Sequence, residues 1–196
     1  MAGLTPRLDI RALTPARWAD FETVLGRSGQ SGCWCMYWIT DGSAAFRDGS
    51  KGGAGAENRG AFHNIVDNGP PPGLLGYVGD EPVGWVRILP RNTLPGLSRS
   101  RLFSTDLPTD GVWSISCFVI RAKWRRQGLT EQLARAAVRH ARENGARAVE
   151  AYPTDTEARK STSAVYLGLA STFRRLGFEE VQRKAPEKPM MRLFLT

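Results

Sequence analysis

The sequence has little cysteine, little histidine and no long hydrophobic run. Its three cysteines, Cys33, Cys35 and Cys117, are odd in number and too few for a disulfide framework. With only two further histidines, neither in a paired spacing, the chain lacks the ligand set of a structural zinc site. No stretch approaches the roughly 18 apolar residues of a membrane span, and Met1 to Arg7 lacks the apolar core of a signal peptide. We therefore expect a cytoplasmic protein without metal or membrane partner.

Length and charge narrow the class further. The chain has 196 residues, enough for one domain with a full core, and a formal net charge of +8. This charge suits a solvated surface, and it also suits a polyanionic ligand. Basic residues are scattered and no nucleic-acid recognition motif is visible, so the sequence disfavours a nucleic-acid partner. A homodimer is compatible with the sequence.

A basic turn with a central glycine stands between a strand pattern and a helix pattern. Val112 to Ile120 is rich in aromatic and β-branched residues and too short for a helix, which predicts a strand. A helical pattern begins at Gln127 and runs to about Asn144. Backbone N–H groups at such a helix start are unpaired, and the helix dipole adds positive charge. The turn therefore predicts a site for an anion of pyrophosphate size.

The residues after the helix predict a second strand. Arg147 to Tyr152 has a strand pattern that ends at Pro153. Strand, turn, helix and parallel strand form a βαβ unit, and open α/β sheets bind ligands at the carboxyl ends of their strands. The predicted anion site lies at that position.

The other elements complete a mixed α/β order. They comprise a strand at Leu8–Leu13, a helix from Pro15 to Leu25, a glycine-rich mobile loop at about 41–55, a helix at Glu57–Val66, strands at Gly73–Gly79 and Val83–Leu89, a helix at Ala164–Leu176, and strands at Glu179–Arg183 and Met191–Leu195. Antiparallel strands therefore precede the βαβ unit, and a hairpin follows it.

The turn and its surroundings resemble one enzyme family. Arg125-Arg126-Gln127-Gly128-Leu129-Thr130 is similar to the R/Q-x-x-G-x-G/A turn of the Gcn5-related N-acetyltransferases (GNAT). That turn holds the pyrophosphate of acetyl-coenzyme A; here Thr130 replaces the usual glycine or alanine. The Cys-Trp-Cys-Met-Tyr-Trp run from Cys33 is similar to one in small bacterial members. The resemblance implies a single GNAT domain over residues 1–196, with the acyl-CoA acyltransferase fold.

The resemblance also implies the residues that hold the cofactor. Backbone groups of the first βαβ strand bond the pantetheine arm, and the turn bonds the pyrophosphate. The family often places an asparagine and a tyrosine beside the arm and the sulfur, where this chain has Tyr166 and Phe173. The implied acetyl-CoA residues are Phe118, Val119, Ile120, Arg125, Arg126, Gln127, Gly128, Leu129, Thr130, Tyr166 and Phe173.

The Cys33–Trp38 segment has two interpretations. It can be a hydrophobic plug that packs the first helix on the sheet. In the family, this region commonly lines the acceptor pocket, and aromatic walls suit a partly apolar amine. On that interpretation the substrate-binding residues are Trp34, Cys35, Tyr37 and Trp38.

The catalytic acid and base are left open by the sequence. No carboxylate lies within the strand Val112–Ile120, and Phe173 has no proton to donate. Our candidates are Glu150, Tyr152 and Ser171; the alternatives are Asp110, Thr172 and a water relayed by Ser114 or Ser116.

The predicted function is that of an acetyl-CoA-dependent N-acetyltransferase. The primary amine of a small molecule attacks the thioester directly, so positioning supplies much of the rate gain. Two alternatives stay open: acetylation of a protein amino group, and a catalytically silent coenzyme A-binding module.

Overall fold

The computed structural model describes residues 5–27, 29, 31–40, 53–158, 161 and 165–195. These residues form one seven-stranded sheet in the order β1-β2-β3-β4-β5-β7-β6. Only β4 and β5 are parallel, and all other neighbours are antiparallel. The strands are β1 (Asp9–Ala12), β2 (Gly73–Val78), β3 (Glu81–Pro90), β4 (Val112–Ile120), β5 (Ala148–Ala151), β6 (Glu179–Arg183) and β7 (Pro189–Phe194).

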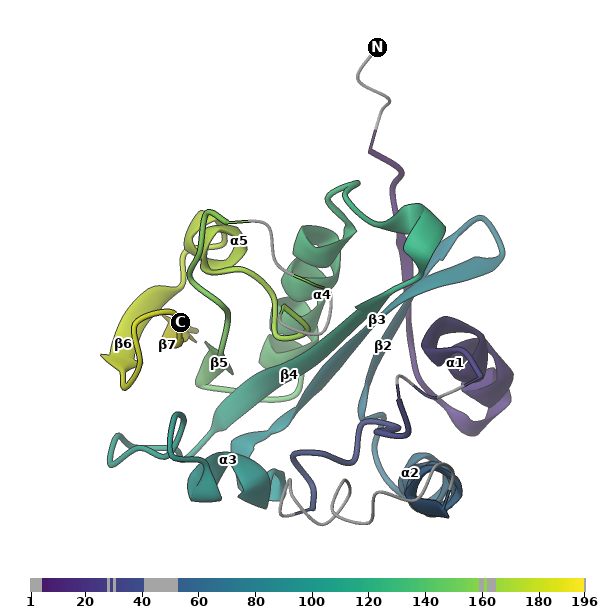
Figure 1. Cartoon of the computed structure of the whole chain (residues 1–196), viewed down its shortest axis with the longest axis horizontal. Coiled ribbons are helices and arrows are strands. Elements are labelled where there is room, and N and C mark those ends of the chain that lie inside the picture. Colours follow the sequence, from purple (N-terminus) through teal and green to yellow (C-terminus); the bar gives the residue numbers. More distant parts are fainter. Residues whose placement is uncertain are drawn as a thin grey trace.

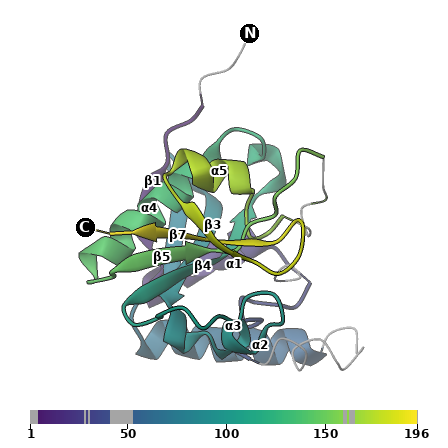
Figure 2. The same cartoon turned by 90° about the vertical axis from the view of Figure 1, so that its left-hand side faces the viewer.

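Helices cover both faces of the sheet (Figures 1 and 2). They are α1 (Trp18–Leu25), α2 (Gly53–Asn68), α3 (Pro95–Arg99), α4 (Leu129–Glu143) and α5 (Ala170–Arg175). Strand β3 is buried on both sides: Trp85 packs with the aromatic side chains of α1 and α2, and Val86 packs with α4. Two buried faces explain why this strand alternates so little between apolar and polar residues.

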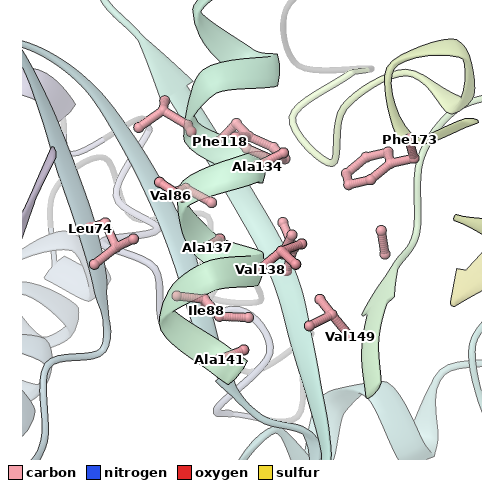
Figure 3. Close-up of a cluster of buried hydrophobic side chains, with 14 of the residues drawn as sticks. Leu74, Val86, Ile88, Phe118, Ala134, Ala137, Val138, Ala141, Val149 and Phe173 are labelled. Carbon is pink, nitrogen blue, oxygen red and sulfur yellow. The ribbon is translucent and has the colours of Figure 1, made fainter. Parts of the chain in front are cut away.

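Helix α4 packs closely on the sheet because its inner face carries small side chains. Ala134, Ala137 and Ala141 are fully buried against the strands, and Figure 3 shows them facing Val86 and Ile88. The apolar residues recur at helical spacing, as the sequence predicts. The helix therefore holds its amino-terminal end beside the end of β4.

Strands β4 and β5 pair over only half the length of β4. Their ladder ends at the pair Ile115 and Ala151. At the same level β4 bulges, because Arg87 of β3 pairs with Cys117 while the next residue, Ile88, pairs with Ile115. Ser116 is the extra residue of that bulge, and bulges bend a strand away from its partner. The carboxyl-terminal half of β4 is therefore open on the β5 side.

The predicted fold class is confirmed, and two element boundaries are wrong. Helix α2 begins at Gly53, inside the predicted loop 41–55, whose residues 41–52 lie outside the described residues. Helix α5 begins at Ala170 rather than at the predicted Ala164, and Ala164 also lies outside the described residues. Gly168 has a φ of +88°, and Thr154 pairs with Leu169 in a parallel bridge. This strand-like pairing replaces the first turns of the predicted helix.

Candidate functional site

The turn before α4 presents several backbone donors. Arg126 and Gly128 both adopt the left-handed conformation, with φ of 62° and 73°. Within the described residues, the N–H groups from Arg126 to Thr130 donate to no backbone oxygen. Left-handed residues that turn successive N–H groups inward form an anion-binding concavity, and here it meets the positive end of a 15-residue helix. The turn can therefore hold a diphosphate.

Neighbouring groups hold this turn in place. The Arg125 Nε donates to the carbonyl oxygen of Ile120 at 2.9 Å, and the Gln127 side chain donates to that of Lys123 at 3.2 Å. A Cβ on Gly128 would meet the Thr5 methyl at 3.5 Å. Because Arg125 and Gln127 bond inward, the exposed side chain of Arg126 is the turn's cation nearest to solvent.

A basic cleft lies on the α1 side of the turn. It has a volume of about 420 Å³ and lies between the end of α1 and the end of β4, where its lining includes Gly26, Ile120, Arg121, Lys123 and Arg125. The cations of Arg121 and Lys123 both pair with Glu81, at 2.6 and 2.8 Å. The cleft adds positive charge beside the anion-binding turn.

The chain after β5 fills part of the gap beside β4. The Phe118 N–H donates to the carbonyl oxygen of Tyr166 at 2.7 Å. Two further hydrogen bonds hold the same stretch from the other side. The Thr154 N–H donates to the carbonyl oxygen of Gly168 at 2.9 Å, and the Ala170 N–H donates to that of Thr154 at 3.0 Å. Residues 166–170 therefore lie between the diverging strands.

Four partly exposed side chains lie near one another on the α1 and α2 side of β4, and we call this cluster the opening. They are Cys33, Tyr37, Cys117 and Tyr166. Burial raises the pKa of the Tyr166 phenol, and the nearby Cys117, Tyr37 and Cys33 raise it further, which places all four together. Burial also raises the pKa of the Cys33 thiol, and a hydrogen bond with Cys35 together with burial raises the pKa of the Cys117 thiol. At ordinary pH Cys33, Cys117 and Tyr166 therefore present neutral S–H or O–H groups.

The Cys33–Trp38 segment divides between core and opening. Trp34, Cys35 and Trp38 are buried, and Trp34 packs against Trp18 and Phe21 of α1. Of the four predicted acceptor residues, Tyr37 alone is partly exposed. The plug interpretation therefore describes three of the four side chains.

Arg87 lies beneath this opening, and we did not predict it as a site residue. Its side chain is 1% exposed, its Nη1 donates to the carbonyl oxygen of Cys35, and β4 places Cys117 directly opposite. A hydrogen bond from Cys117 lowers the pKa of the Cys35 thiol, and the Arg87 charge lowers it further. A charged residue inside an otherwise apolar strand pattern was the sequence signal for Arg87.

Glu150 and Tyr152 belong to a closed buried network. The Arg91 Nη1 lies 2.6 Å from a Glu150 carboxylate oxygen and 2.6 Å from the Tyr152 hydroxyl, and Arg192 bonds the other carboxylate oxygen. The Tyr152 hydroxyl lies 2.8 Å from Ser114. Burial and the Glu150 charge raise the pKa of Tyr152 well above its usual value. Within this buried network each carboxylate oxygen of Glu150 is therefore bonded to an arginine side chain.

The candidate site residues of helix α5 lie in different surroundings. Phe173 is fully buried and packs between Phe118 and Phe178, at ring distances of 6.2 and 5.1 Å. Ser171 is exposed, and Thr172 is buried. Asp110 is exposed and paired with Arg147, at the opposite end of β4 from Phe118. These placements do not bring Ser171 or Asp110 to the opening.

The described part of the chain holds no cluster of three or more side chains suited to a metal ion. None of its helices has the length and apolar character needed to span a membrane.

Comparison with known proteins identifies the fold. A sequence model of the acetyltransferase (GNAT) family matches residues 33–169. No curated protein matches the chain. Aminoglycoside acetyltransferase AAC(6′)-Ib in complex with coenzyme A is similar in structure, with a TM-score of 0.55 and 14% identity, covering 96% of this chain and 95% of that one.

Two other solved structures are similar to the same degree. PaiA N-acetyltransferase from Thermoplasma acidophilum in complex with coenzyme A has a TM-score of 0.51 and 12% identity, covering 96% of this chain and 99% of that one. Ribosomal-protein-alanine N-acetyltransferase from Brucella melitensis has a TM-score of 0.52 and 15% identity, covering 96% and 100%. At these identities the likeness concerns the fold.

Proposed function

The chain belongs to the acetyltransferase (GNAT) family, whose members use acetyl-CoA, and from this premise we propose that it acetylates the primary amine of a small molecule. The family match makes the chain an acyltransferase. The acceptor and the roles of individual residues are our proposals. We also propose a cytoplasmic location, which the three free cysteines support.

The observation that carries the proposal is the set of N–H groups from Arg126 to Thr130 that have no backbone acceptor in the described part of the chain. A diphosphate fits a concavity of donors at a helix start, and the exposed Arg126 adds a cation. Acetyl-CoA supplies the acetyl group as an activated thioester. We propose that the turn holds its pyrophosphate and that backbone groups of Phe118, Val119 and Ile120 hold its pantetheine arm.

The Phe118 N–H is the donor that we assign to the thioester carbonyl. A backbone donor aimed at a developing oxyanion stabilises it more than a flexible side chain does. In this structure the carbonyl oxygen of Tyr166 accepts that N–H. Cofactor binding must therefore release the Tyr166 carbonyl, so hydrogen exchange in residues 165–169 is expected to rise when acetyl-CoA is added.

We assign the two proton transfers, from the amine and to the departing thiolate, to hydroxyl groups rather than to carboxylates. Each carboxylate oxygen of Glu150 is bonded to an arginine, so Glu150 is poorly placed to act as the base. The Ser116 hydroxyl is buried at the bulge and has no hydrogen-bond partner among the described residues. We propose that Ser116 holds the water that accepts the amine proton, and that the protonated Tyr166 phenol assists the departing thiolate.

A small acceptor fits the opening better than a protein chain does. Its four side chains come from three separate segments, and we propose that they enclose a small acceptor, whereas a protein amine requires an open groove. The solved structures named above include, by name, an enzyme for aminoglycosides and one for a ribosomal protein. Fold similarity therefore does not choose between these acceptors.

Two measurements test the proposal. Isothermal titration should detect acetyl-CoA binding in the micromolar range, and thiol release should then follow with small amines but not with peptides bearing the same amino group. Turnover of peptides alone would favour the protein acceptor. Micromolar binding with no turnover for any amine would leave a silent coenzyme A-binding module.

A further inference from the structure

Arg87 is a buried charge without a carboxylate partner. Within the described residues, the ionisable groups that act on its charge are the thiols of Cys33, Cys35 and Cys117. Removing a cation from water costs several kcal/mol unless an anion and hydrogen bonds compensate. Arg91, the other buried arginine of β3 and its following turn, has such an anion in Glu150. Arg87 therefore lacks the compensating carboxylate that Arg91 has. Stability of the fold gives no reason to keep such a charge at this position.

The unpaired atoms of Arg87 lie on one edge of its guanidinium group. Nη1 donates to the Cys35 carbonyl oxygen, whereas Nε and Nη2 are buried with no hydrogen-bond partner among the described residues. In a guanidinium group, the N–H bonds of Nε and Nη2 run parallel, and their spacing matches the two oxygens of a carboxylate. The free edge is therefore the one that binds an oxyanion at two points.

The position of this edge connects it to the opening. Arg87 pairs across the sheet with Cys117, which precedes Phe118, the residue whose N–H we assign to the thioester. The thiols of Cys33 and Cys117 both border the opening and act on the Arg87 charge. Ser116 precedes Cys117 in the chain, and its hydroxyl has no partner among the residues that the structure describes.

We propose that the acceptor amine also carries an oxyanion, such as a carboxylate or a phosphonate, and that the Nε and Nη2 edge of Arg87 binds it. This inference rests on the proposed function, since it names the substrate class of the same site. Amine and oxyanion are separated by only a few atoms, because Arg87 and Phe118 lie one residue apart in strand register. Arg87 is 1% exposed, so the proposal requires that binding of cofactor and acceptor displace a group that covers it.

The experiment compares matched acceptors in three variants. Thiol release from acetyl-CoA is measured with α-, β- and γ-amino acids, aminophosphonates, and the carboxamide of each amino acid. The proteins are wild type, Arg87→Met and Arg87→Lys, with Arg135→Met as a control at an exposed arginine of α4. Diamines, aminoglycosides and short peptides complete the panel.

The expected result is a loss confined to the charged acceptors. Wild type should prefer an amino acid over its carboxamide by at least about tenfold in kcat/KM. Arg87→Met should lower kcat/KM for the acid by about 30-fold or more, since two charge-assisted bonds are lost. Carboxamides should change less than about threefold. For Arg87→Lys, kcat/KM for the acid should lie between the values of wild type and Arg87→Met, because lysine keeps the charge but cannot donate two parallel hydrogen bonds. Arg135→Met should match wild type.

A stability measurement separates binding from structure. Arg87→Met should keep or raise Tm, because it removes a buried charge that lacks a partner anion. The matched variant Arg91→Met should lower Tm, since it leaves Glu150 with one arginine fewer. A large loss of Tm in Arg87→Met would mean that a thiolate already balances Arg87, and it would overturn the inference.

Other outcomes distinguish a wrong oxyanion site from a wrong acetyltransferase function. Equal use of acids and carboxamides, or turnover of diamines, aminoglycosides or peptides alone, would overturn the oxyanion site and leave the acetyltransferase proposal intact. Absence of acetyl-CoA binding would defeat the proposed function and this inference together.

Discussion

Replacing Gly128 by valine is the sharpest test of the cofactor turn. Gly128 has a φ of +73°, and a Cβ there would meet the Thr5 side chain, whose methyl group lies at 3.5 Å, an ordinary contact. The substitution therefore acts through the backbone and not through a clash. A β-branched residue in the left-handed conformation costs about 1–2 kcal/mol. The chain can lower that cost by rotating the turn, which moves the N–H groups out of alignment.

The expected loss of affinity follows from the number of donors affected. Hydrogen bonds to a charged group contribute about 1.5–3 kcal/mol each. Losing two of the bonds from residues 126–130 therefore removes about 3–6 kcal/mol, which is about a hundredfold or more in Kd. Isothermal titration with acetyl-CoA measures this loss, and thermal unfolding shows whether the fold is kept.

Gly145 provides the matched control. It ends the same helix, has a φ of +80° and has open space where a Cβ would stand. Gly145→Val should therefore lose a similar amount of stability without loss of cofactor affinity. If Gly128→Val binds acetyl-CoA within threefold of wild type, the turn does not hold the pyrophosphate and our assignment is wrong.

Three further predictions concern two groups of ion pairs and one buried aromatic ring. Glu150→Gln should lower the free energy of unfolding by about 3–5 kcal/mol in denaturant titrations, because two arginines lose their shared anion; unchanged stability with a lost kcat would instead identify Glu150 as the base. Arg174 and Arg183 hold the pKa of Asp155 at about 2, so Asp155→Asn should lower Tm at pH 7. That difference from wild type should vanish as pH falls from about 3.9, the unfolded value, to about 2; a difference that persists below pH 2 would exclude the ion pairs as its cause. Phe173→Tyr should destabilise by about 1–3 kcal/mol, since a hydroxyl would be buried among aromatic rings; a stable variant with higher kcat would show that this position reaches the departing thiol.

The βαβ unit is predictable because its signals are local. Strand β4 spans Val112–Ile120 as predicted, and α4 lies within the predicted range. The glycine that bends the turn, the apolar spacing of the helix and the proline after β5 each act within a few residues. The left-handed conformation of Gly128 follows from the same local chemistry.

Helix α5 shows where local reasoning fails. Ala164 to Leu176 has helical composition, yet residues 166–169 form bonds with Thr154 and Phe118 instead. Those partners are distant in sequence. Their backbone groups are available for these bonds only because β4 and β5 diverge. Tertiary pairing therefore overrides a weak local propensity.

The buried polar groups show the same limit. From the sequence, Glu150 was a candidate base, and Arg87 was one more residue of a strand. Their difference arises from neighbours, since Glu150 meets two arginines from β7 and the turn after β3, whereas Arg87 meets three thiols.

Short-range chemistry was thus sufficient to predict the strand–turn–helix–strand order around α4 and the left-handed glycine of its turn, because each depends on residues adjacent in the chain. Packing decided which groups surround Arg87, Glu150 and Tyr166. The energy of a charge or a backbone donor depends on which distant groups share its low-dielectric surroundings, and those groups meet only when the sheet assembles.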